Sequence, residues 1–248
     1  MGSLSETVLW HDIECGRYRA DLPLWRELAA AAGDPILEIG AGTGRVALDL
    51  ARRGHAVTAV EIDPELAGEL VTRAAGLPVD VMCADITQQP DTGRHRLVIA
   101  PMQVIQVLGG ERARLAMLRH ARDSLAPGGS VVVAFVDTVA DRTFGRSELK
   151  HEDRLVLDGS RYTSRAVSVQ FSRRAIQIVR ERRTRDAAGR EQRSRAHQSL
   201  AVLPRAQVIG EAARAGLAFA RAHEIPGTDH DLGCVALAFR HGAGSTPR

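Results

Sequence analysis

The sequence predicts one α/β domain built around a mostly parallel sheet, with a polar β insertion late in the chain. Three observations lead to this fold class. Short apolar segments alternate with helical segments between residues 35 and 136, which is typical of βαβ units. A glycine-rich loop joins the first of these strands to its helix. The alternation then stops, and residues 161–200 show the polar alternation of half-solvated antiparallel strands.

The bulk composition is typical of a folded globular protein. The chain has 248 residues, of which 44% are hydrophobic and 25% are charged. Its first residues lack the basic start and apolar run of a signal peptide, and the apolar run 131–136 is too short to span a bilayer. We therefore expect a cytoplasmic protein with no membrane partner.

Cysteine and charge usage argue against two further classes. Cys15, Cys83 and Cys234 lie far apart and form no CxxC pair, so we expect free thiols and no metal site. The formal net charge is +3, and Lys150 is the only lysine. Since the acids almost balance the arginines, a compositional bias explains the arginine content better than nucleic-acid binding does.

The first elements follow from apolar spacing and from capping residues. Apolar residues recur at intervals of three and four over residues 9–32, which predicts a helical segment, with Asp21 and Pro23 as a helix start. A strand at 35–39 runs into glycines, and a helix at 45–53 follows and stops at Gly54.

The same alternation continues to residue 136 and then changes. Further strands and helices of the α/β part are expected at 55–61, 63–75, 79–83, 96–100, 111–126 and 130–136. The polar region 161–200 is expected to hold three antiparallel strands with turns near 172–174 and 186–189. A helix and two strands should close the chain, at 204–215, 218–224 and 233–239.

These elements predict four parts of the chain. They are an N-terminal helical lid (1–33), a core (34–137 and 201–241), a β-rich insertion (138–200) and a flexible tail (242–248).

The loop at residues 38–44 (EIGAGTG) carries the functional argument. Glycines there let the backbone turn tightly and let a ligand lie directly against it. The segment resembles the first motif of class I S-adenosylmethionine-dependent methyltransferases, in which an acid ends the strand before G-x-G-x-G. A dinucleotide fingerprint would need glycine where Arg45 stands, and Glu38 would repel a pyrophosphate. A sulfonium with a free amino group has the opposite preference, so charge favours the methyl donor.

Later residues extend this resemblance to about residue 137. Glu61 lies 21 residues after Gly40, near the spacing at which a carboxylate reaches a ribose. Asp85 resembles the family's acid for the adenine amino group, and the fourth strand ends where the family lines the methyl-transfer site. The resemblance implies a Rossmann-like, doubly wound, mostly parallel seven-stranded sheet whose last strand is antiparallel. It assigns cofactor binding to Glu38, Gly40, Ala41, Gly42, Gly44, Glu61, Ile62, Asp85, Ile86, Ala100 and Pro101.

The acceptor side is less determined by the sequence. Methyl transfer from a sulfonium needs alignment and exclusion of water, and a hydroxyl acceptor also benefits from a base. Residues 10–18 resemble the lid of small-molecule members, which implies Tyr18 and Trp10 as walls and His11 as a candidate base. Five further candidates to act on the acceptor cannot be ranked: His151, His197, His223, His230 and Asp137.

We therefore expect a small-molecule N- or O-methyltransferase that uses S-adenosylmethionine, with a homodimer as a further expectation. One alternative is a methyltransferase that acts on RNA or protein through the arginine-rich insertion, and another is a cofactor-binding partner subunit without catalysis. A nicotinamide enzyme is disfavoured by Arg45. Methylation of a flipped DNA base is disfavoured because residues 100–103 (APMQ) lack the D/N-P-P-F/Y pattern.

Overall fold

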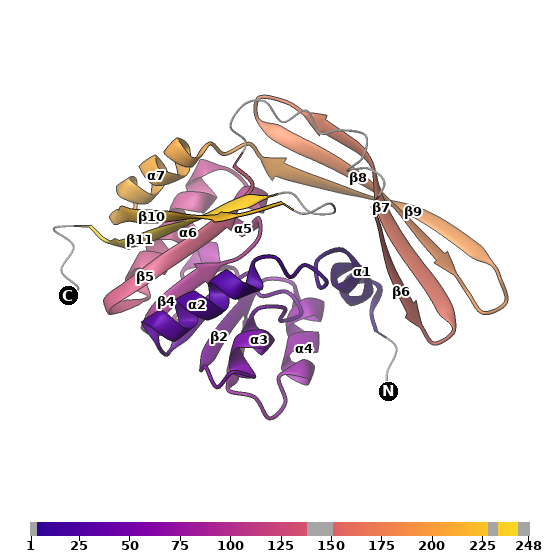
Figure 1. Ribbon diagram of the computed structural model, residues 1–248, viewed down its shortest axis with the longest axis horizontal. Coiled ribbons are helices and arrows are strands. Elements are labelled where there is room, and N and C mark those ends of the chain that lie inside the picture. Colours follow the sequence, from indigo (N-terminus) through magenta and orange to yellow (C-terminus); the bar gives the residue numbers. More distant parts are fainter. Residues whose placement is uncertain (1–3, 138–150, 228–232, 243–248) are drawn as a thin grey trace.

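The computed structural model describes residues 4–137, 151–227 and 233–242, which form two separate β-sheets and the helices around them (Figure 1). The larger sheet has seven strands in the order β10-β11-β5-β4-β1-β2-β3. The five strands before the insertion, β1 to β5, all run parallel, and β11 is antiparallel to both of its neighbours. The predicted doubly wound sheet with an antiparallel last strand is therefore confirmed.

The seven strands lie close to the predicted positions. Their bounds are β1 (Ile36–Ile39), β2 (Val57–Glu61), β3 (Val79–Cys83), β4 (His95–Ala100), β5 (Leu125–Phe135), β10 (Leu217–Ile225) and β11 (Cys234–His241). The main difference is in β5, which begins five residues early. Residues 127–129, expected as a turn, are part of this strand, where the register with β4 shifts between Leu125 and Ser130.

Helices cover both faces of the seven-stranded sheet. One apolar cluster joins α6 (Glu111–Asp123) and α7 (Arg205–Arg214) to one face, and a second joins α2 (Leu22–Ala32), α3 (Ala47–Ala51) and α4 (Pro64–Arg73) to the other. Two short helices that the sequence analysis did not predict, η1 (Ile86–Gln88) and α5 (Val104–Val107), follow β3 and β4. They lie where the strands end, because the chain turns back there toward the next helix.

The predicted helical segment 9–32 is wrong in one respect, since it is two helices. The first, α1 (Glu6–Glu14), is separated from α2 by a turn at residues 15–21. Gly16 allows this turn, because a Cβ there would lie 2.7 Å from the carbonyl oxygen of Asp12. The break separates α1 from the core, so that α1 lies between the core and the second sheet (Figure 1).

The second sheet has four antiparallel strands, where three were predicted. They are β6 (Glu152–Leu157), β7 (Ser160–Phe171), β8 (Ala175–Arg185) and β9 (Glu191–Ala201), in that order. The expected turns at 172–174 and 186–189 do join β7 to β8 and β8 to β9. The first strand was missed because its acidic start, Glu152 and Asp153, suggested an exposed loop.

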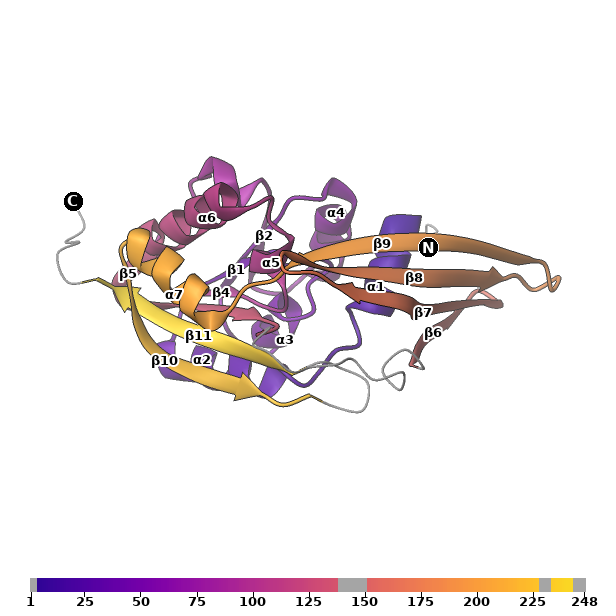
Figure 2. The same ribbon diagram turned by 90° about the horizontal axis from the view of Figure 1, so that it is seen from above.

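This insertion sheet extends away from the core beside α1 (Figure 2). We call the face that contacts α1 its inner face, where Tyr162 packs edge-on against Trp10 with ring centroids 6.0 Å apart. The opposite side is the outer face. Within the described residues, the helices are all too short or too polar to cross a membrane.

Candidate functional site

A cavity of about 340 Å³ lies at the carboxyl ends of β1, β2 and β4. The strand order reverses at this point, because β1 is flanked by β2 on one side and by β4 on the other. In doubly wound sheets the loops diverge at such a position and leave a crevice for a ligand. We call this space the first cavity.

Most of the residues predicted to bind the cofactor line the first cavity, and three do not. Gly42 lies beneath His11, Gly44 packs against Leu48 and Leu70, and Ala100 is buried in the apolar core. The predicted residues on the cavity wall are His11, Glu38, Gly40, Ala41, Glu61, Ile62, Asp85, Ile86 and Pro101.

Glu38 is a buried carboxylate on this wall. Its side chain is at the end of β1, and the residue is only 2% exposed. Burial raises the pKa of Glu38 to about 8, although the guanidinium of Arg45 acts in the opposite direction. Among the described residues, none donates a hydrogen bond to its Oε2 atom. A cationic N–H donor in the cavity would both satisfy this oxygen and favour its ionised form.

Glu61 ends β2 and holds the glycine loop in place. Its Oε2 accepts from the backbone N–H of Gly42 at 2.8 Å, and its Oε1 accepts from that of Asp63 at 2.9 Å. Each carboxylate oxygen can accept more than one hydrogen bond, so Glu61 can also accept from ribose hydroxyls. Asp63 caps α4 by accepting from the backbone N–H groups of Glu65 and Leu66.

Acidic and apolar groups lie together on the side of the cavity formed by β3 and α5. Asp85 caps η1, and hydrogen bonds from the side chain and backbone of Thr87 lower its pKa. Ile62 is 63% exposed and Val107 is 54% exposed, although both are large aliphatic side chains. Exposed aliphatic groups on a cavity wall suit the faces of a flat aromatic ring.

The glycines of the loop are required by close contacts. Gly40 has φ +72°, and a Cβ there would lie 2.6 Å from Val104. Gly42 has φ +58°, and a Cβ there would lie 2.5 Å from two ring atoms of His11. The loop can therefore present bare backbone to the cavity only because these residues lack side chains.

A second cavity of about 390 Å³ adjoins the first, between the core, α1 and the inner face of the insertion sheet. Its walls include Tyr18 from the segment after α1 and Ile178 from β8. Four residues line both cavities and mark the junction between them: Cys15, Met102, Gln103 and Gln198. Cys15, Gln103 and Gln198 had no predicted role of their own, because none of them belongs to a sequence motif that marks a binding site.

Two carboxamides at the junction have no protein partner. Within the described residues, the side chains of Gln103 and Gln198 make no hydrogen bond. Gln103 occupies the N-cap position of α5 but does not cap it, and it follows Met102, whose φ is +54°. Non-glycine residues in that conformation are strained, and such strain is concentrated at functional sites. Cys15 is an unreactive neighbour, since burial raises its pKa to about 11.

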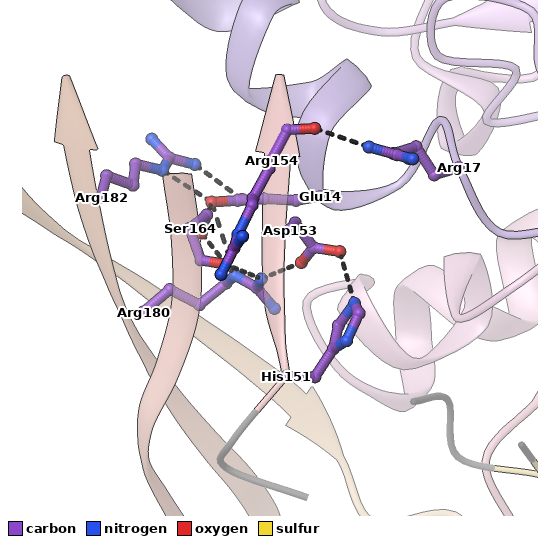
Figure 3. Close-up of polar contacts among 8 residues, drawn as sticks. All are labelled: Glu14, Arg17, His151, Asp153, Arg154, Ser164, Arg180 and Arg182. Carbon is purple, nitrogen blue, oxygen red and sulfur yellow. Dashed lines mark hydrogen bonds and ion pairs between the residues drawn. The ribbon is translucent and has the colours of Figure 1, made fainter. Parts of the chain in front are cut away.

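The lid helix α1 is tied to the insertion sheet by a cluster of polar contacts (Figure 3). Glu14 accepts from Nε and Nη2 of Arg182, both at 2.8 Å, and from the hydroxyl of Ser164 at 2.7 Å. Arg180 donates to Ser164 at 2.8 Å and pairs with Asp153. Although burial raises the pKa of Glu14, the bonds from Arg182 and Ser164 lower it overall. The inner-face arginines are therefore neutralised by acids of this chain.

The segment between α1 and the core is held by a second set of contacts. Arg17 donates to the carbonyl oxygen of Arg154 at 2.6 Å (Figure 3). Arg45 forms a bidentate pair with Asp21 at 2.6 and 2.7 Å, and its guanidinium lies 5.3 Å from the ring centroid of Tyr18. Tyr18 therefore packs on Arg45 and lines the second cavity, and its role as an acceptor wall stays a prediction.

The other histidines suggested as bases do not have side chains placed to act on an acceptor. His151 pairs with Asp153 at 3.1 Å, and His230 lies outside the described residues. His197 belongs to the wall of the second cavity, but it is paired with Val179, so alternation directs its side chain to the outer face.

Two further candidates lie in the core and away from both cavities. His223 is in β10, paired with Ala236 of β11. Asp137, suggested as a group that orients the acceptor, instead binds Arg205 at 2.6 Å. Neither residue lines either cavity.

Comparison with known families and structures identifies the part of the chain that contains the first cavity. Residues 36–129 match a family model described as a methyltransferase domain. A dimethyladenosine transferase from Saccharomyces cerevisiae is 43% identical over 47 residues, which are 19% of this chain. The chain spans only 15% of that curated relative.

Solved structures resemble the whole chain. The sugar N-methyltransferase KedS8 from Streptoalloteichus has a TM-score of 0.74 at 16% identity, covering 97% of this chain and 96% of that one. The amino pentose methyltransferase CalS10 from Micromonospora echinaspora, with bound S-adenosylmethionine, has a TM-score of 0.71 at 20% identity, covering 97% and 99%. At these identities the likeness shows a shared fold.

Proposed function

We propose that this chain transfers the methyl group of S-adenosylmethionine to an amine nitrogen of a small polar molecule, such as an amino sugar. The transferase class and the cofactor were predicted from the sequence, and the match of residues 36–129 to a methyltransferase-domain model supports both. The acceptor is our proposal.

The first cavity has the chemistry that the donor requires. S-adenosylmethionine supplies an activated methyl group on a sulfonium and carries an ammonium group, a ribose and an adenine. Within the described residues Glu38 has a carboxyl oxygen without a donor, and a cationic ligand would favour its ionised form. Glu61 and Asp85 can accept from hydroxyl and amino groups, and Ile62 offers an apolar surface. Bare backbone at Gly40 leaves room for the ligand against the loop.

The observation that carries the acceptor proposal is the junction between the cavities. Gln103 comes from the core and Gln198 from the insertion sheet. Both line both cavities, and their carboxamides make no hydrogen bond within the part of the chain that the structure describes. A carboxamide oxygen can accept from an amine N–H and so direct the nitrogen lone pair toward the donor. A neutral amine needs only such alignment, because the methyl group is already activated.

The size and closure of the second cavity support a small acceptor. A volume of about 390 Å³ is in the range of small-molecule sites. The insertion sheet and α1 cover it, and their contacts at Glu14 keep Arg182 engaged with an acid. This neutralisation favours a small acceptor over RNA held by the inner-face arginines. The names of the similar structures, which are sugar and amino pentose methyltransferases, point to the same class of acceptor.

The test is methyl transfer from S-adenosylmethionine with a deuterated methyl group to a panel of amino sugars, detected by mass spectrometry. Each amino sugar is paired with the sugar that carries a hydroxyl at the same position. We expect labelled product from at least one amino sugar and none from its hydroxyl partner. Labelling of the hydroxyl sugars alone would overturn the N-methyl assignment. Retention of RNA that weakens with salt would favour the RNA alternative.

We also propose that the chain forms a homodimer through the outer face of the insertion sheet. One cross-strand row there alternates in charge: Glu152, Arg165, Glu181 and Arg195. Such a row can pair with a second copy of itself, and Val156 on the same face is 67% exposed. Light scattering after gel filtration should give the dimer mass, and Val156→Asp should give the monomer mass.

A further inference from the structure

His11 lies directly on the glycine loop. A Cβ on Gly42 would be 2.5 Å from both Cε1 and Nε2 of His11, so this edge of the ring contacts the loop backbone. His11 lines the first cavity, together with Glu38, and does not line the second. His11 therefore lies beside the cavity proposed for the methyl donor. It does not lie at the junction, where a base would have to deprotonate the methyl acceptor.

The hydrogen bonds behind His11 determine which ring nitrogen carries the proton. The Asp12 carboxylate can only accept hydrogen bonds, and it is also bound by Arg73 at 3.0 Å. Thr43 must therefore donate its single hydroxyl hydrogen to Oδ1 of Asp12, which lies 2.7 Å away. Although burial raises the pKa of Asp12, hydrogen bonds with His11, Arg73 and Thr43 hold it below its usual range. The 3.4 Å contact between Thr43 Oγ1 and His11 Nδ1 must then have nitrogen as the donor.

In the neutral ring, a hydrogen on Nδ1 leaves a lone pair on Nε2. This lone pair belongs to the ring edge that lies over Gly42. Two residues that line the first cavity therefore each have an acceptor without a donor among the described residues, Nε2 of His11 and the buried Oε2 of Glu38. An ammonium group has three N–H donors and can satisfy both.

We propose that His11 is a positioning residue that accepts, through Nε2, a hydrogen bond from the ammonium group on the methionine arm of the cofactor. This inference rests on the proposed function. The arm would then be fixed from two elements, by Glu38 at the end of β1 and by His11 in the lid. Because Asp12 joins the lid to Arg73 of α4, the orientation of the ring is set by the core.

The inference is tested by binding of three nucleosides, measured by calorimetry on the full chain. S-adenosylhomocysteine has the ammonium and the carboxylate, decarboxylated S-adenosylmethionine has only the ammonium, and 5′-methylthioadenosine has neither. His11→Phe keeps a ring over Gly42 without nitrogen, and His11→Gln restores an acceptor near the position of Nε2. His55→Ala removes a histidine that pairs with Asp34 away from both cavities and is the control.

We expect His11→Phe to weaken the first two nucleosides about tenfold or more, as for one hydrogen bond to a charged group, and to leave 5′-methylthioadenosine within about twofold. His11→Gln should recover most of the loss, and His55→Ala should change nothing. Equal weakening of all three nucleosides by His11→Phe would mean that His11 only packs the lid, and the inference would be wrong. Weakening of S-adenosylhomocysteine alone would place the carboxylate at His11 and also overturn it.

A different result would implicate the proposed function itself. If the wild-type chain bound none of the three nucleosides, both the methyltransferase proposal and the role of His11 would fail. Thermal melting of each variant shows whether it is folded, so that a loss of binding is compared only among folded proteins.

Discussion

Replacing Glu38 by glutamine should remove a pH-dependent cost of folding. Burial raises the pKa of Glu38 to about 8 in the folded chain, against an ordinary value of 4.5. Between these two pH values the folded protein binds more protons than the unfolded chain, so the free energy of unfolding falls as the pH rises. The slope is at most about 1.4 kcal/mol per pH unit, which amounts to on the order of 5 kcal/mol over the whole window.

Glutamine has nearly the same shape as glutamate and cannot ionise. At pH 5 the variant and the wild type should therefore have similar stability, and by pH 8 the variant should be more stable by several kcal/mol. Binding should change in the opposite direction. An ammonium-bearing ligand favours ionised Glu38, so the affinity of the wild type for S-adenosylhomocysteine should rise up to about tenfold per pH unit between pH 6 and 8. The variant should bind weakly with little pH dependence.

Urea unfolding followed by circular dichroism at pH 5, 6, 7 and 8 measures the difference in stability between the two proteins. Taking the difference cancels the other titrating groups. Glu27→Gln, which removes an exposed glutamate of α2, controls for the loss of one carboxylate. If the stability curves of wild type and Glu38→Gln run parallel over this range, Glu38 is ionised in the folded protein and the reasoning is refuted.

Three further predictions concern the loop, the lid and the insertion. Gly42→Ala should reduce S-adenosylhomocysteine affinity at least tenfold in calorimetry, because the added Cβ would meet His11 at 2.5 Å; unchanged affinity would contradict the loop geometry. Glu14→Gln should lower the free energy of unfolding by about 1–3 kcal/mol, since it weakens the bidentate bond with Arg182, and a double-mutant cycle with Arg182→Ala should show coupling. Gln106→Leu should lower the free energy of unfolding in urea by about 1–3 kcal/mol, because the buried carboxamide of Gln106 hydrogen-bonds backbone groups at the ends of β5 and β9. An unchanged free energy of unfolding would mean that these hydrogen bonds do not stabilise the fold.

The donor side of the site could be predicted because its residues follow from local sequence. Glu38 and Glu61 each end a strand, and the loop after Glu38 is contiguous. The carboxyl ends of parallel strands meet at one edge of the sheet, so strand order was enough to bring these residues together. The structure adds that Gly44 serves packing against Leu48 and Leu70 instead of lining the cavity.

The β insertion shows where a sequence pattern is insufficient. Alternation predicted strands at 161–200, but it could not say which face would be covered. A shift of one residue exchanges the two faces of a strand, so His197 and Gln198 were equally plausible as site residues. Pairing of Val179 with His197 places Gln198 on the inner face. β6 was missed for another reason, since its acidic start suggested a loop, whereas Asp153 in fact contacts Arg180 of β8 across the strand between them.

The sequence by itself determined the fold class, the glycine loop and the acids that suit a methyl donor, because each depends on periodicity and spacing within one βαβ unit. Only the tertiary structure decided the acceptor side. Its junction joins Cys15, Gln103 and Gln198, and its lid is held by Glu14 and Arg182, which are 168 residues apart. Such contacts depend on strand register and on the packing of distant elements, and short-range patterns in the chain do not encode either one.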